Sequence, residues 1–350
     1  MELIHGGDWA GFASQYGQMP LDFSVNVSPL GIPDGVRRAI EHSAAEADRY
    51  PDPLCRALRQ GIAKKEGVAV EHILCGSGAA ELIFRAVLAR RPRRALLHAP
   101  TFAEYEAALQ TANCQITYNC LREENGFVLD SGILEAIQPG TDMVFLCQPN
   151  NPTGLTVPRP LLLQILARCR AVGALLVADE CFTDFLDEPT TFSLTGELLN
   201  WRNHLLILKS FTKLYAMAGV RLGYCLSADT ALLKAMASAG PPWSVSSLAQ
   251  AAGLAALEEK DYVRLVRALI RAERPRLAAA LEGFGLRIVP GEANYLLFQC
   301  RSPLASPLAK RGILLRSCGN YRGLDGTWYR VSVRTRAENE RLIQTLREVL

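Results

Sequence analysis

The alternation of short apolar runs with helical stretches constrains the fold of this chain more than any other feature. The runs that we expect to be strands cover residues 73–75, 95–98, 115–118, 143–147, 174–178, 205–208 and 222–226. Helical stretches separate most of them, which favours a largely parallel sheet covered by helices on both faces. The functional residues of such sheets lie beyond the carboxyl ends of the strands. We therefore expect polar residues that closely follow these strands to converge on one site.

The segment after the strand at 205–208 carries the most informative polar residues. Lys213 follows Ser210 and Thr212, and Arg221 comes eight residues after the lysine. A lone lysine between strands is usually a solvated surface residue. Here, two hydroxyl groups and an arginine that can bind an anion bidentately accompany the primary amine. This combination suits pyridoxal phosphate, because that cofactor carries an aldehyde, a phosphate and a ring nitrogen.

Two further strand ends and one glycine turn support the same site. Asn151 lies in a turn after the strand at 143–147, and Asp179 directly follows the strand at 174–178. Either motif alone is common and usually structural. The glycine turn at 76–78 opens a helix but lacks the third glycine of a dinucleotide fingerprint, and the chain has no P-loop lysine motif. That turn is either a plain tight turn or a phosphate site built from helix amides.

Composition argues against several other classes of protein. The chain has 350 residues, of which 49% are hydrophobic and 21% charged, so it can bury a sizeable core. A net charge of +3 without a basic block argues against nucleic-acid binding. We expect no membrane span and no signal peptide, because the most apolar window contains arginines and the N-terminal residues lack an apolar core. Ten cysteines without a Cys-x-x-Cys pair predict reduced thiols, no metal site and a cytoplasmic location.

We expect three parts along the chain. They are an N-terminal arm at 1–45 that packs with the small domain, a large domain at 46–245, and a linking helix with the small C-terminal domain at 246–350. The arm shows no sustained helical or strand period, so it is a disordered tail unless its aromatic residues Phe12, Tyr16 and Phe23 are docked. The linking helical region covers 248–281 and is predicted to be interrupted at Pro275.

Taken together, these segments resemble the fold-type I pyridoxal-phosphate enzymes. The resemblance implies an α/β aminotransferase-like fold with a mostly parallel central sheet flanked by helices, a smaller α+β C-terminal domain and an N-terminal arm. It implies that Lys213 binds the cofactor covalently and that Asp179 pairs with the ring nitrogen and keeps it protonated, which makes the ring an electron sink. The other implied cofactor contacts are Asn151 and Phe102 at the ring, and Gly78, Ala79, Ser210, Thr212 and Arg221 at the phosphate. Tyr50 would reach that phosphate from the second subunit of a homodimer.

Within this group the chain resembles the histidinol-phosphate aminotransferases and, more closely, the enzymes that decarboxylate L-threonine O-3-phosphate in cobalamin synthesis. The matching segments are 5–7, 22–24 with Asn26, 29–31, 102–105, Phe182 with 184–185, 242–245, 316–318 and 320–321. The resemblance places substrate contacts on His5, Gly6, Asn26, Asn151, Arg316 and Arg330. By position in its strand alone, Arg330 would be an edge or solvent residue. An amino acid phosphate carries about three negative charges at neutral pH, which two arginines and a histidine suit.

The reaction implied by this resemblance is loss of the α-carboxylate as carbon dioxide, which leaves (R)-1-amino-2-propanol O-2-phosphate. Transamination of histidinol phosphate is the alternative on the same fold. A non-catalytic ligand sensor is a third reading, disfavoured because Lys213, Asp179 and Arg221 are all present and no DNA-binding segment is appended. One residue departs from the pattern of many relatives. Phe182 replaces a tyrosine that hydrogen-bonds to the cofactor ring oxygen, which should change the electronics of the bound cofactor.

Overall fold

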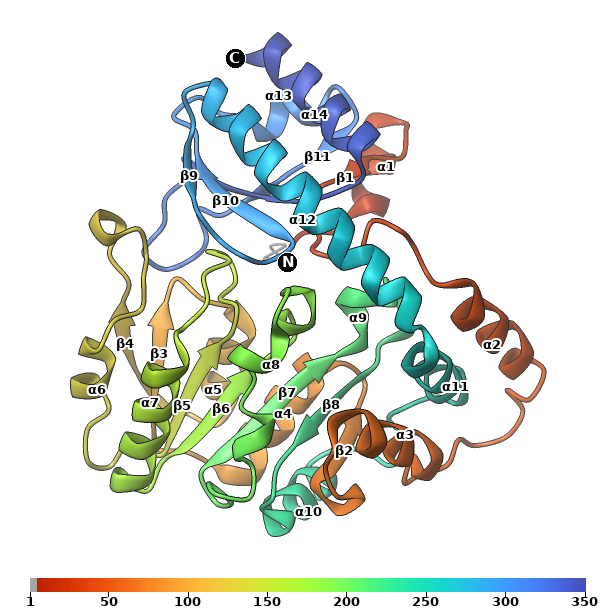
Figure 1. The fold of residues 1–350 in the computed structure, drawn as a ribbon, viewed down its shortest axis with the longest axis vertical. Coiled ribbons are helices and arrows are strands. Elements are labelled where there is room, and N and C mark those ends of the chain that lie inside the picture. The colour runs from red at the N-terminus through yellow and green to blue at the C-terminus, as the bar shows by residue number, and fades with distance from the viewer. Residues whose placement is uncertain (1–4) are drawn as a thin grey trace.

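A seven-stranded sheet is the largest element of the computed structural model, which describes residues 5–350 (Figure 1). Its strands lie in the order β2 (Ile73–Gly76), β8 (Gly223–Leu226), β7 (Leu205–Ser210), β6 (Leu175–Asp179), β5 (Met143–Cys147), β3 (Arg94–Ala99) and β4 (Gln115–Cys120). Of these strands, β8 runs antiparallel to both neighbours, whereas the remaining pairs are parallel. The predicted mostly parallel central sheet is therefore confirmed.

Helices cover both faces of this sheet, which explains why its central strands are apolar on both sides. One face packs against α4 (Ala79–Arg90), α5 (Ala103–Thr111) and α10 (Thr230–Ser238). The other packs against α3 (Arg56–Glu66), α6 (Gly132–Ala136), α7 (Arg159–Val172) and α11 (Ser247–Glu258). The short helices α8 (Pro189–Phe192) and α9 (Phe211–Leu214) follow the ends of β6 and β7. Single 3-10 turns are η1 (Val70–His72), η2 (Glu123–Asn125), η3 (Thr183–Phe185), η4 (Thr195–Glu197) and η5 (Ala218–Val220).

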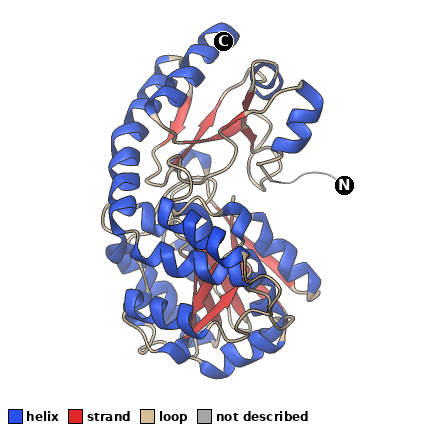
Figure 2. Cartoon of the chain, turned by 90° about the vertical axis from the view of Figure 1, so that its right-hand side faces the viewer, coloured by secondary structure: helices blue, strands red, loops and turns tan. Residues whose placement is uncertain are grey.

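A smaller antiparallel sheet lies across the carboxyl-end edge of the large one (Figures 1 and 2). Its order is β12 (Arg316–Ser317), β13 (Trp328–Ser332), β10 (Tyr295–Gln299) and β9 (Arg287–Val289). The helices α13 (Ala305–Ala309) and α14 (Arg336–Val349) accompany it. A long helix, α12 (Lys260–Gly283), runs from α11 beside the large sheet to the small sheet, where it contacts β9 and α14.

The N-terminal arm is structured over its described residues, so of the two alternatives the docked arm, and not the disordered tail, is present. It contains α1 (Trp9–Tyr16), β1 (Leu21–Asp22) and α2 (Asp34–Ala44). Short-range caps define α1: the Asp8 side chain accepts a hydrogen bond from the Gly11 amide at 3.0 Å, and Gly17 ends the helix in the left-handed region. Phe12 and Phe23 are buried, and β1 pairs in parallel with β11 (Ile313–Leu314). Residues 1–4 of the predicted arm lie outside the described residues.

The linking helical region also differs from the prediction. The break falls at Glu259, between α11 and α12, and Pro275 lies inside the continuous helix α12. Proline removes one backbone hydrogen bond, but the buried side chains of Ile270 and Leu277 pack on either side of it and hold the helix in place. Within the described range, none of the helices has both the length and the apolar character needed to cross a bilayer. The domain boundaries and the cytoplasmic location stay predictions.

Candidate active site

A cavity of about 430 Å³ lies where the carboxyl ends of β5, β6 and β7 meet the small sheet and the N-terminal arm. Most of the residues singled out from the sequence line it, although they come from distant parts of the chain. These are His5, Gly6, Asn26, Ala79, Phe102, Asn151, Asp179, Ser210, Thr212, Lys213, Arg221, Arg316 and Arg330. The convergence expected from the strand ends is therefore present.

Lys213 lies in α9, directly after β7. The Ser210 side chain caps this helix by accepting a hydrogen bond from the Thr212 amide at 3.1 Å. Burial lowers the pKa of the Lys213 amine to about 8; the charges of Arg330 and Arg221 act in the same direction, whereas Cys181 and Asp179 oppose the shift. The neutral form of this amine, which is the nucleophile, is therefore a minority at neutral pH but far more abundant than in a lysine with the ordinary pKa of 10.5.

Asp179 ends β6 and is fixed by two donors. The Tyr105 hydroxyl donates to its Oδ2 at 2.6 Å, and the Cys181 amide donates to its Oδ1 at 3.0 Å. Burial and the nearby Asp179 charge raise the pKa of Tyr105 well above its usual range, so the phenol stays a donor. A fixed carboxylate of this kind can accept a hydrogen bond from a protonated ring nitrogen.

The start of α4 and the side chain of Arg221 form an anion cradle. Gly78 has a φ of +90°, and a Cβ atom built there would lie 2.9 Å from Arg221 Nη2. The amide of Ala79 begins α4, where backbone N–H groups lack partners within the helix. Gly78 itself does not line the cavity but contributes by allowing Arg221 to approach the helix terminus. A phosphate group fits these donors.

Two arginines of the small sheet enter the cavity from neighbouring strands. Arg316 lies opposite Arg330 in the β12–β13 register. Arg330 is buried rather than at an edge: it donates through Nη1 to Asn151 Oδ1 and through Nη2 to the Ser24 carbonyl at 2.8 Å. Its buried Nε has no hydrogen-bond partner among the described residues. Arg316 donates through Nη2 to Asn320 Oδ1 at 2.9 Å.

The N-terminal arm closes one side of the cavity. His5 Nε2 lies 2.5 Å from Glu104 Oε1, and the His5 ring centroid lies 5.7 Å from that of Phe102. A Cβ atom at Gly6 would lie 2.6 Å from Ser24, so only glycine permits this approach. Asn26 is buried, and its Oδ1 has no hydrogen-bond partner within residues 5–350. The arm therefore presents polar groups to the cavity that a ligand can use.

Besides Gly78, Tyr50 is the predicted contact that does not line the cavity. Its side chain is 80% exposed and packs against the ring of Trp243, with 4.7 Å between the ring centroids. This chain therefore does not place Tyr50 in its own site.

Several residues that line the cavity were not assigned a cofactor or substrate contact from the sequence. They are Ser24, Val25, Ala80, Glu104, Cys147, Cys181 and Tyr321. Cys181 lies in the turn that directly follows Asp179, and Ser24 and Val25 lie in the bend before Asn26, so closeness in sequence to predicted site residues was the available signal. No sequence signal joins Glu104 to His5, which lies 99 positions away.

The chain belongs to the aminotransferase class I and II family, whose model matches residues 18–346. Among curated proteins it is 42% identical to the threonine-phosphate decarboxylase of Salmonella typhimurium, over 99% of this chain and 96% of that protein. It is 36% identical to a histidinol-phosphate aminotransferase of Desulfitobacterium hafniense, over 93% and 91%. Among solved structures, the histidinol-phosphate aminotransferase of Sinorhizobium meliloti in complex with pyridoxal-5'-phosphate superposes with a TM-score of 0.87 at 22% identity, covering 100% of this chain and 96% of that one. This likeness confirms the predicted fold.

Proposed function

We propose that this chain binds pyridoxal phosphate and decarboxylates L-threonine O-3-phosphate, as a step in making the aminopropanol arm of cobalamin. The products are (R)-1-amino-2-propanol O-2-phosphate and carbon dioxide. The observation that carries the proposal is the identity of 42% to a threonine-phosphate decarboxylase, which extends over 99% of this chain.

The residues present in the cavity fit pyridoxal phosphate. Lys213 would hold it covalently and Asp179 would contact its ring nitrogen. The cradle of Gly78, Ala79 and Arg221, with the hydroxyls of Ser210 and Thr212, would take its phosphate, and Phe102 and Asn151 would contact its ring. A side chain larger than glycine at position 78 would fill the space that Arg221 uses. When bound, this cofactor supplies a covalent attachment for the substrate amine and a sink for the electrons of the broken carbon–carbon bond.

The remaining polar groups suit a substrate with a carboxylate and a phosphate. Arg330 would orient the carboxylate, because its Nη1 and Nη2 atoms are already fixed by Asn151 and the Ser24 carbonyl. Arg316 and His5 would bind the substrate phosphate. Decarboxylation replaces the carboxylate with one proton at the α-carbon. Lys213 Nζ can deliver that proton, because an amine with a pKa of about 8 is mostly protonated at neutral pH once it is free.

A homodimer would complete the site. Tyr50 is exposed beside Trp243 at the surface. In a homodimer, its hydroxyl could reach the cofactor phosphate bound in the other subunit. This exposure supports the proposal that Tyr50 acts across the subunit interface.

Transamination of histidinol phosphate is the second candidate, favoured by the identity of 36% to a histidinol-phosphate aminotransferase. The two functions are separated by offering each substrate to the purified protein with pyridoxal phosphate. We expect threonine phosphate to yield aminopropanol phosphate in the nuclear magnetic resonance spectrum. We expect histidinol phosphate with 2-oxoglutarate to yield no glutamate. Formation of glutamate from histidinol phosphate, with threonine phosphate left intact, would refute the proposal.

A further inference from the structure

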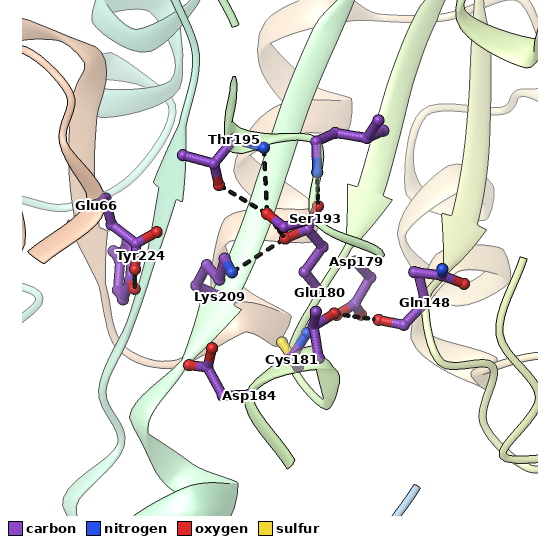
Figure 3. A network of polar contacts seen from close by, with 12 residues as sticks. Glu66, Gln148, Asp179, Glu180, Cys181, Asp184, Ser193, Thr195, Lys209 and Tyr224 are labelled. Carbon is purple, nitrogen blue, oxygen red and sulfur yellow. Dashed lines mark hydrogen bonds and ion pairs between the residues drawn. The ribbon is translucent and has the colours of Figure 1, made fainter. Parts of the chain in front are cut away.

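A buried ion pair lies directly behind the proposed cofactor site. Along β6, Leu175 and Val177 pack on the α4–α5 side of the sheet, so Asp179 faces that side and the next residue, Glu180, faces the other. Lys209, in the neighbouring strand β7, places its Nζ 3.0 Å from Glu180 Oε2. The two side chains are 5% and 0% exposed. Figure 3 shows them pointing toward one another.

The carboxylate of the pair accepts two further hydrogen bonds. The Leu194 amide donates to Glu180 Oε1 at 2.7 Å, and the Ser193 hydroxyl donates to Glu180 Oε2 at 2.7 Å. Burial alone would lower the pKa of Lys209, but Glu180, Asp184 and Glu66 raise it above its usual range. Lys209 therefore stays a cation while buried, and the carboxylate has one defined set of partners.

Neighbouring polar contacts connect the region around this ion pair to the helices α3 and α12. Lys65 of α3 lies 3.4 Å from Asp184 and 3.7 Å from Glu66. The Tyr224 hydroxyl donates to Glu66 at 2.6 Å, and Tyr224 is the register partner of Lys209. Arg267 of α12 donates to the Asp184 carbonyl at 2.8 Å. The ends of β6 and β7 are thus tied to α3 and to the helix that leads to the small sheet.

We propose that Glu180 and Lys209 are positioning residues for the cofactor site, holding the ends of β6 and β7 in one fixed relation. Asp179 directly precedes Glu180, and Ser210 directly follows Lys209, with Lys213 three residues further on. Apolar side chains of similar volume commonly replace a buried ion pair without loss of stability, so stability alone does not explain this one. A buried ion pair whose carboxylate has three fixed partners permits fewer arrangements than an apolar contact. This inference rests on the proposed function, because it assumes that pyridoxal phosphate binds between Asp179 and Lys213.

The test compares variants that remove this ion pair with a control variant that removes a more exposed ion pair elsewhere in the chain. The double variant Glu180→Gln/Lys209→Met removes both charges, and glutamine keeps an acceptor for the Leu194 amide. Lys209→Arg keeps the cation. The control variant, Glu273→Gln/Arg336→Met, removes the ion pair between α12 and α14, whose N–O distance is 2.7 Å. For each protein we would measure the dissociation constant of pyridoxal phosphate, the circular dichroism of its bound absorption band, and the melting temperature of the cofactor-free chain.

We expect the Glu180→Gln/Lys209→Met variant to melt near the wild-type temperature yet to bind the cofactor about tenfold more weakly, with a changed circular dichroism band. Lys209→Arg should retain most of the affinity, and the control variant should keep wild-type affinity and dichroism whatever its melting temperature. Wild-type cofactor affinity and dichroism in the Glu180→Gln/Lys209→Met variant would overturn the inference. Failure of the wild-type protein itself to bind pyridoxal phosphate would instead refute the proposed function, and this inference with it.

Discussion

The electrostatic surroundings of Lys213 determine what its amine can do. The buried amine is surrounded by more positive than negative charge, because Arg221 and Arg330 also line the cavity. Burial and these two cations hold its pKa at about 8. Sequence alone located this lysine, because hydroxyl groups and an arginine accompany it in the chain. It could not predict the influence of Arg330, which approaches from a strand 117 positions away.

The lowered pKa of Lys213 predicts the pH dependence of cofactor attachment. Only the neutral amine attacks an aldehyde, so the rate constant should rise about tenfold per pH unit below 8 and level off above it. A lysine with the ordinary pKa of 10.5 would keep gaining rate beyond pH 10. Stopped-flow absorbance of cofactor-free protein mixed with pyridoxal phosphate measures this profile. Borohydride reduction should then fix the pyridoxyl group on the Lys213 peptide, and labelling of another lysine would contradict the assignment.

Gly78 gives a second prediction for a single residue. In Gly78→Ala, a Cβ atom would enter the space of Arg221 Nη2 and the backbone would be held at a φ of +90°. We expect cofactor affinity to fall about tenfold or more, because Arg221 must withdraw from the phosphate. The matched control is Gly219→Ala, where an added Cβ meets no atom within 4 Å. Fluorescence titration with pyridoxal phosphate measures both, and equal affinities would contradict the cradle.

At the scale of helices and strands, long apolar patterns were predictable and short capped elements were not. The central strands could be identified because both faces of the sheet are buried. The helix α1 was missed, since its boundaries depend on Asp8 and Gly17 rather than on a sustained period. The predicted interruption at Pro275 was wrong, because packing of α12 against the rest of the molecule outweighs the one hydrogen bond that proline removes.

The arm gives the prediction at this scale. His5 reaches the cavity only because α1 and β1 dock the arm, and it contacts Glu104. A contact of this kind is worth about 1–3 kcal/mol, so His5→Ala should raise the KM for threonine phosphate roughly ten- to hundredfold with little change in kcat. Met19→Ala is the control, because that arm residue is 64% exposed and does not line the cavity. Steady-state kinetics with an unchanged KM in His5→Ala would assign the arm a purely structural role.

At the scale of the whole molecule, three parts of the chain build one cavity. The large sheet supplies Lys213 and Asp179, the small sheet supplies Arg316 and Arg330, and the arm supplies His5. The class of the fold followed from the sequence pattern, but this enclosure depends on contacts between residues far apart in the chain. A second subunit would add Tyr50.

Mixed dimers test that contribution. We expect Tyr50→Phe to weaken cofactor binding about tenfold, as loss of one hydrogen bond to a charged phosphate does. Mixing Tyr50→Phe subunits with Lys213→Ala subunits should regenerate one wild-type site per mixed dimer, because the second subunit still carries Tyr50. Equilibrium titration of the mixture should then reveal a class of sites with wild-type affinity. If every site in the mixture binds pyridoxal phosphate weakly, Tyr50 does not act across an interface.

The most direct test of the central claim is the number of carbon dioxide molecules released per active site without any 2-oxo acid. Decarboxylation returns the cofactor to its starting aldehyde form in each cycle, whereas transamination leaves it as an amine that needs an acceptor. With threonine phosphate as the only substrate, we predict sustained release, with many carbon dioxide molecules formed per site. The account would be contradicted if no carbon dioxide were released and the cofactor were converted once to its amine form.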